Sequence, residues 1–157
     1  MRRLLDPLPW ILLGLLLLLN GCQTTAPLPP INLSEPGWKL REGQVLWQTG
    51  RGAPEIAGEI LVAIHPNGRA WIQFMKTPLP LVSGQITPRK WQIEFIPEKR
   101  TFTGDEQPPA RFLWLYLLRA LHGLLPPEPL QFHQSADGSW RLENKTNGEI
   151  LSGYLIP

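Results

Sequence analysis

The side chains that could carry out chemistry in this chain are few and scattered. His65, His122 and His133 are far apart, and none forms the His-x-Glu, Cys-His or Gly-x-Ser-x-Gly spacing that builds a metal site or a nucleophile. Asp105 and Glu106 are adjacent and could form a catalytic carboxylate pair, although neighbouring acids in a loop are commonly only solvated. The sequence therefore predicts a protein that is not an enzyme and needs no metal or cofactor.

The positive charges give a similar picture. The formal net charge is +2, which predicts no surface for nucleic acid or another polyanion. Arg111 and Arg119 are two helical turns apart and could receive a phosphate or a lipid headgroup. The alternative is that they pair with surface acids or lie at the rim of a sheet.

Cys22 is the only cysteine, and it ends a segment typical of an export signal. Arg2 and Arg3 precede an apolar run over residues 10–19, and the small residue Gly21 comes directly before the cysteine. The run is shorter than the roughly 20 residues of a membrane-spanning helix. Leu-Asn-Gly-Cys at residues 19–22 resembles the bacterial lipobox, which implies cleavage before Cys22 and acylation of its thiol. The alternative is an ordinary secreted protein with one free thiol.

Acylation would anchor the mature protein to membrane lipid, because two or more acyl chains hold a protein stably in one leaflet. In bacteria with a known sorting rule, aspartate after the cysteine retains a lipoprotein in the inner membrane. Gln23 stands there in this chain, so the resemblance favours the outer membrane, and we expect the domain to face the periplasm. We expect a signal peptide over residues 1–21, a lipidated, proline-rich tether over 22–37, and one domain over 38–157.

The domain shows the pattern of short strands. We expect strands over residues 44–48, 55–65, 69–76, 81–87, 90–96, 140–144 and 149–156, and loops over 97–109 and 124–129. Trp91, Ile93 and Phe95 alternate with polar residues, and this pattern predicts a sheet with one apolar face. The Asn-Gly and Asp-Gly pairs between strand-like runs favour hairpin turns and therefore antiparallel neighbours.

One apolar segment, residues 111–122, interrupts the strands and predicts a helix. Prolines precede it, Gly123 follows it, and further prolines prevent its continuation. Arg111, Arg119 and His122 share one narrow face with two leucines, and the rest of the helix is apolar. Packing this helix on the apolar face of the sheet would bury the apolar surfaces of both elements. The predicted fold class is α+β, an open antiparallel β half-barrel with an apolar helix across its concave face.

Two segments of the domain resemble the bacterial lipoprotein localization factors LolA and LolB, and LolB more closely. They are Thr-Pro-Leu-Pro-Leu at residues 77–81, which feeds a strand pair, and Leu-Leu-Arg-Ala-Leu-His-Gly-Leu-Leu-Pro at 117–126, followed by a returning strand at Leu130 and Phe132. The similarity covers residues 38–135. The chain is shorter than LolB after Asp137, which implies a smaller cavity or one filled by the protein's own helix.

The resemblance implies that the protein carries or receives acyl chains or a lipidated protein. The candidate acyl-binding residues are apolar side chains of the sheet and the helix: Trp71, Trp91, Ile93, Phe95, Phe112, Trp114 and Leu117. Apolar residues in such positions are more often core. Leu79 and Leu81 could form an exposed contact loop, or a buried turn. The alternative function is that of a structural or assembly lipoprotein with a filled core that docks a protein partner.

Overall fold

The computed structural model describes residues 26–156, so the predicted signal peptide and Cys22 lie outside the described residues. Within them the chain forms one sheet of nine strands and one helix: β1 (Lys39–Gln48), β2 (Glu55–Ile64), β3 (Ala70–Lys76), β4 (Leu79–Ile86), β5 (Lys90–Phe95), β6 (Arg100–Asp105), α2 (Leu113–Leu121), β7 (Leu130–Gln134), β8 (Ser139–Asn144) and β9 (Ile150–Leu155). No helix in this part of the chain is long and apolar enough to cross a membrane.

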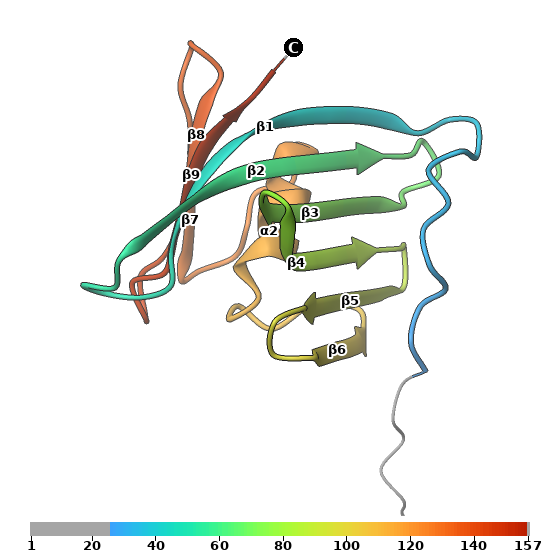
Figure 1. The fold of residues 1–157 in the computed structure, drawn as a ribbon, viewed down its shortest axis with the longest axis horizontal. Helices are drawn as coiled ribbons and strands as arrows, with labels where there is room; N and C mark the ends of the chain where they lie inside the picture. The colour runs from blue at the N-terminus through green and yellow to red at the C-terminus, as the bar shows by residue number, and fades with distance from the viewer. Residues whose placement is uncertain (1–25, 157) are drawn as a thin grey trace, which may run out of the picture.

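The sheet runs in the order β6-β5-β4-β3-β2-β1-β9-β8-β7, and every neighbouring pair is antiparallel. Helix α2 connects the two edge strands, β6 and β7, and thus crosses the sheet. Figure 1 shows β7–β9 crossing β3–β6 at a steep angle, with α2 behind β3 and β4. This arrangement confirms the predicted open antiparallel sheet with a helix on its concave face, and it is consistent with a half-barrel.

The sheet bends where β1 passes from β2 to β9, and two glycines allow the close approach. A Cβ atom on Gly43 would lie 2.0 Å from the carbonyl oxygen of Tyr154, and one on Gly153 would lie 2.1 Å from that of Gln44. Contacts this short are sterically forbidden for any side chain. The steep crossing of the two halves of the sheet therefore depends on glycine at both positions.

Helix α2 begins after the prolines, at Leu113, and ends as expected at a glycine. Gly123 adopts a φ of +85°, and its N–H donates to the carbonyl oxygen of Ala120 at 2.9 Å, a geometry common at helix C-termini. The predicted narrow polar face is present only at the C-terminal end, where Arg119 is half-buried and His122 is exposed. The sheet wraps around the rest of the helix.

Strand β6 is not predicted by the sequence, and the expectation of a loop over residues 97–109 is wrong there. β6 pairs with β5 along its whole length, from Arg100 opposite Phe95 to Asp105 opposite Lys90. Phe102 is its only large apolar residue. An edge strand with one apolar side chain lacks the alternation that reveals a strand in a sequence.

The predicted tether contacts the sheet over part of its length. Residues 28–38, which we call the strap, lie along the sheet at the right of Figure 1. The backbone N–H of Leu28 donates to Gln92 Oε1 at 2.7 Å, and Gln85 Nε2 donates to the carbonyl oxygen of Pro29 at 3.4 Å. Near the other end, Arg69 pairs with Glu35. Much of the predicted proline-rich tether, from Leu28 onward, is therefore held against the sheet.

Candidate functional site

Five of the seven candidate acyl-binding residues come together between α2 and the sheet. Ile93 and Leu117 are 0% exposed, Trp114 is 1% exposed, and Trp91 and Phe112 are also buried. Phe95 is half-buried at the edge of the same cluster and contacts Phe102 edge-on. The sequence thus correctly places these six side chains in the cluster between the helix and the sheet.

Trp71 is the exception, because it lies on the opposite face of the sheet. Its indole Nε1 donates to Ser83 Oγ at 3.1 Å, and it lines a hollow with Leu28 of the strap. Ile72 and Phe74 take the positions that face the helix. The segment Ala-Trp-Ile-Gln-Phe-Met has apolar residues in both phases of its alternation, so the sequence could not determine which face is inward.

The interface between helix and sheet is filled. The rings of Trp114 and Phe74 stack with centroids 4.9 Å apart, and Trp47 meets Trp114 edge-on at 5.5 Å. Leu113, Leu115, Leu117 and Leu118 have no exposed surface at all. Since a void wide enough for an acyl chain would leave its lining accessible, no such space adjoins these leucines.

The predicted contact loop is exposed at one of its two leucines. Leu79, the first residue of β4 after the turn from β3, is 64% exposed. Leu81 is half-buried and packs against the core. A pairing irregularity between Phe74 and Met75 accompanies this turn. Of the two, only Leu79 therefore offers an apolar side chain to a partner.

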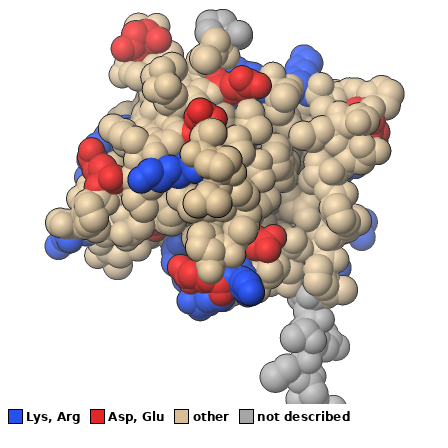
Figure 2. Space-filling model, viewed as in Figure 1, with Lys and Arg blue, Asp and Glu red and all other residues tan. Residues whose placement is uncertain are grey.

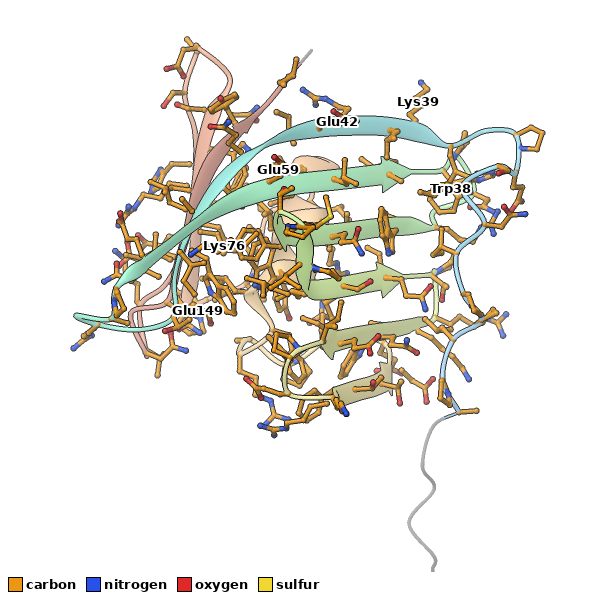
Figure 3. All side chains as sticks on the ribbon, viewed as in Figure 1. Trp38, Lys39, Glu42, Glu59, Lys76 and Glu149 are labelled. Carbon is orange, nitrogen blue, oxygen red and sulfur yellow. The ribbon has the colours of Figure 1, made fainter. Side chains whose placement is uncertain are left out.

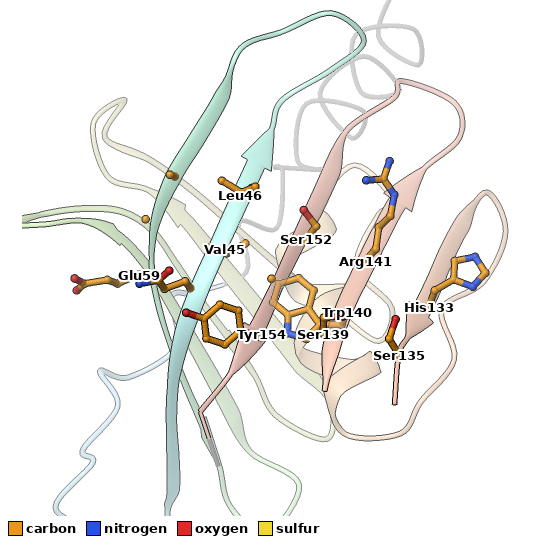
Figure 4. Close-up of a pocket in the computed structure, with 14 residues that line it drawn as sticks. Val45, Leu46, Glu59, His133, Ser135, Ser139, Trp140, Arg141, Ser152 and Tyr154 are labelled. Atoms are coloured by element: carbon orange, nitrogen blue, oxygen red, sulfur yellow. The ribbon is translucent and has the colours of Figure 1, made fainter. Parts of the chain in front are cut away.

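An open groove lies on the other face of the sheet, away from α2, and the sequence does not predict it. Its volume is about 880 Å³. Figure 4 shows its side chains spread across β1, β9, β8 and β7, with Glu59 at one side and His133 at the other. The residues of this outer groove are Gln44, Val45, Leu46, Ala57, Gly58, Glu59, His133, Ser135, Ser139, Trp140, Arg141, Ser152, Gly153 and Tyr154.

Strand register arranges much of the outer groove in two parallel rows. One row crosses the sheet through Glu59, Gln44, Tyr154 and Ser139, each directly opposite the next. The second row is Ala57, Leu46, Ser152, Arg141 and His133. Residues opposite one another in paired strands share a face, so these side chains form a continuous surface. The centre of this surface carries Leu46 and the ring of Tyr154. The hydroxyl-bearing residues Ser152 and Ser139 lie directly opposite them on the neighbouring strands.

Charges of both signs flank this apolar centre. Glu59 lies at one end, and Arg141 lies toward the other, where its guanidinium is 3.6 Å from Glu143. Lys145 also binds Glu143, at 3.0 Å, and this hydrogen bond holds the pKa of the Glu143 carboxyl below its ordinary value. Hydrogen bonds from Ser139 likewise lower the pKa of Asp137.

Glu149 is a buried acid near the crossing of the two halves of the sheet, at the left of Figure 3. It is 8% exposed, and its Oε1 accepts a hydrogen bond from Trp47 Nε1 at 2.9 Å. Burial raises the pKa of this carboxyl to about 7, which the bond from Trp47 only partly opposes. The carboxyl group therefore changes its charge near neutral pH.

The polar residues considered for catalysis lie apart. The ring of His65 is 3.1 Å from the carbonyl oxygen of Pro36 in the strap, His122 follows α2, and His133 lies in β7. Within residues 26–156, no group of three or more His, Cys, Asp or Glu side chains could hold a metal ion. Asp105 ends β6, and the next residue, Glu106, has a positive φ of 61°.

The two arginines of the helical segment contact aromatic rings. The guanidinium of Arg111 lies over Phe112 and Phe102, 4.8 and 5.5 Å from the ring centroids. Arg119 lies over Tyr116 at 6.0 Å. Each contact is a cation–π interaction. Arg111 therefore closes the end of the core beside β6.

Local sequence carries no signal for the outer groove. Its rows form only because β1 pairs with β9, which follows it by about a hundred residues. Leu46 and Tyr154 occupy outward positions of strands whose other face is core, and this alternation is the one available hint. No protein-family model matches the chain, and comparison with curated proteins finds no match.

Proposed function

We propose that this protein is a lipid-anchored, non-enzymatic lipoprotein of the bacterial outer membrane, with a LolA/LolB-like half-barrel, that docks a protein partner in the outer groove. The lipobox-like sequence ending at Cys22 supports the anchor. The half-barrel with its crossing helix supports the kinship. The partner is a polypeptide segment, because the groove offers apolar, hydroxyl and charged side chains together.

The observation that carries this proposal is the division of the two faces of the sheet. The concave face is occupied by α2, whose leucines are buried in the core. The opposite face carries the 880 Å³ groove. A ligand can therefore reach the outer groove without moving the helix, whereas a ligand beneath the helix would have to displace packed aromatic rings.

The charge pattern favours a polypeptide over an acyl chain. An acyl chain fits an apolar tunnel, and its contact with Glu59 and Gln44 would remove water from these polar groups without replacing the lost hydrogen bonds, which costs free energy. A peptide carries its own donors and acceptors and can satisfy them. Interfaces of this kind combine an apolar centre with a polar rim.

A second candidate function, carriage of an acyl chain or of a lipidated protein, is favoured by the size of the groove. Its volume of about 880 Å³ lies within the roughly 300–1,000 Å³ typical of small-molecule pockets. In this case the chain would lie over Leu46 and Tyr154, rather than on the side chains beneath the helix. The two functions share the same surface and differ in what occupies it.

Two exposed leucines of β1 provide a matched test. Leu46 lies in the groove and Leu40 lies outside it on the same outward face, and they are 42% and 50% exposed. After crosslinking in whole cells, the protein and its Leu40→Arg variant should both yield one stoichiometric protein adduct, and Leu46→Arg should lose it. Retention of the adduct by Leu46→Arg would refute the groove as the docking site.

The acyl-chain candidate is tested on the same variants. Purified protein would be extracted for bound lipid by mass spectrometry and titrated with a fluorescent fatty acid. Saturable binding that Leu46→Arg abolishes and Leu40→Arg retains would favour carriage over protein docking. The anchor is tested separately: intact mass should show acyl groups on Cys22, and Cys22→Ser should leave the membrane fraction.

A further inference from the structure

The strap limits which part of the domain can approach the membrane, given the proposed lipid on Cys22. The strap is held at the N–H of Leu28 by Gln92 of β5. Leu28 is six positions after Cys22, and a fully extended chain covers at most about 3.5 Å per residue. The anchor is therefore within about 20 Å of Leu28, and the start of β5 is close to the lipid surface.

Two exposed leucines lie near the same end of β5. Leu124 and Leu125, in the loop after α2, are 53% and 85% exposed. Leu124 lines a hollow with Lys90 and Trp91, the first two residues of β5. Gln92, which holds the strap, is the next residue. The leucine loop and the start of the strap thus lie beside the same end of β5, on opposite faces of the sheet.

The fold itself gives no reason for these leucines to be exposed. Neither belongs to the hydrophobic core or to the half-buried residues that pack against it. Lys90 and Arg119 line the hollow beside Leu124, as does Glu106, so the charges there are mixed. Figure 2 likewise shows both signs interspersed on the face it presents. Apolar burial rather than charge is the interaction this loop can offer.

We infer that the loop carrying Leu124 and Leu125 contacts the phospholipid surface in which the Cys22 lipid is embedded, an inference that rests on the proposed lipid anchor. The strap and the loop together then fix the orientation of the domain. In Figure 1 the strap runs along the ends of β3–β6, while the strands of the outer groove cross at the opposite side. The groove is therefore held away from the lipid, where a partner reaches it from the aqueous side.

Leu79 is the natural competitor for membrane contact, because it is 64% exposed. It begins β4, whereas Ile86, at the end of that strand, lines the hollow beside Leu124. Seven steps of strand at about 3.3 Å each place the two ends roughly 23 Å apart. An orientation that brings Leu125 to the lipid thus carries Leu79 away from it.

Photocrosslinking from defined positions tests this orientation. A benzophenone amino acid would replace Leu125, Leu79 or, as a control, Leu40 in the full lipidated protein, reconstituted in vesicles of phosphatidylethanolamine and phosphatidylglycerol. The yield of phospholipid adducts should be at least fivefold higher from position 125 than from 79 or 40. An equal yield, or a higher yield from position 79, would overturn the inference.

Two further experiments distinguish a failure of this inference from a failure of the proposed lipid anchor. The mature chain, coupled through Cys22 to a maleimide lipid, should give the same fivefold ratio even if cells do not acylate Cys22. Intact mass of the native protein reports acylation alone. Releasing the strap with Arg69→Ala and Gln92→Ala together should reduce the ratio below twofold, and an unchanged ratio would refute the role of the strap.

Discussion

Replacing the buried acid Glu149 by glutamine should make the protein more stable above pH 7. It should also remove most of the pH dependence of the free energy of unfolding between pH 8 and pH 5. In the folded protein the pKa of this carboxyl is raised from 4.5 to about 7 by burial. In the unfolded chain the carboxyl is solvated and ionises near its ordinary pKa. Above pH 7 the folded state therefore has to hold a charge that burial disfavours.

The sign and size of the effect follow from the two pKa values. Between pH 7 and 4.5 the folded protein binds a proton that the unfolded chain does not, so stability rises as the pH falls. Each pH unit between the two values is worth about 1.4 kcal/mol, which gives about 3 kcal/mol in total. Between pH 8 and pH 5 we expect a rise of about 2.5 kcal/mol from this group.

Urea denaturation at pH 5, 6, 7 and 8 measures the effect. The wild-type free energy of unfolding should rise toward pH 5, and that of Glu149→Gln should be nearly flat and higher than wild type at pH 8. The glutamine side chain would keep an oxygen acceptor for Trp47 Nε1. Glu143→Gln is the matched control, because the pKa of Glu143 is lowered and its contribution is lost as pH falls. A wild-type profile that is flat between pH 8 and 5, or a rise that Glu149→Gln retains, would refute the reasoning.

Three other substitutions test the core, the bend and the strap. Trp114→Ala should lower the free energy of unfolding by about 3–5 kcal/mol in urea denaturation, because its ring fills the space against Phe74; a loss below about 1 kcal/mol would mean that the interface is loosely filled. Gly153→Ala would place a Cβ 2.1 Å from a β1 carbonyl oxygen and should lower the thermal midpoint sharply. Gly50→Ala is the control, because a Cβ there would lie 3.6 Å from the nearest atom, and its midpoint should be unchanged. Similar midpoints for the two variants would contradict the close approach of β1 and β9. Gln92→Ala should speed amide hydrogen exchange at Leu28 with little change in global stability, and unchanged exchange would show that this bond does not hold the strap.

The sequence predicts the parts of the fold that depend on local patterns. The apolar helix is indicated by its flanking prolines and Gly123. The alternation of Trp91, Ile93 and Phe95 correctly places their side of β5 toward that helix. These signals are readable because each lies within one element, where the period of the side chains and the nature of the ends determine the structure.

The features that the sequence does not predict depend on pairing between distant segments. The strap has the proline-rich composition of a tether, and its contacts with Gln85, Gln92 and Arg69, which hold it on the sheet, carry no local signal. The outer groove forms from the pairing of β1 with β9. The sequence places Trp71 on the wrong face because both phases of β3 carry apolar side chains.

Crosslinking from the outer groove in intact cells tests the central claim most directly. A benzophenone amino acid would replace Tyr154, which is exposed in the middle of one groove row, and position 40 would serve as the control. We predict one discrete protein adduct from position 154 and none from position 40. Phospholipid adducts alone from position 154, or the same protein adduct from both positions, would contradict the assignment of the groove as a docking site for a protein partner.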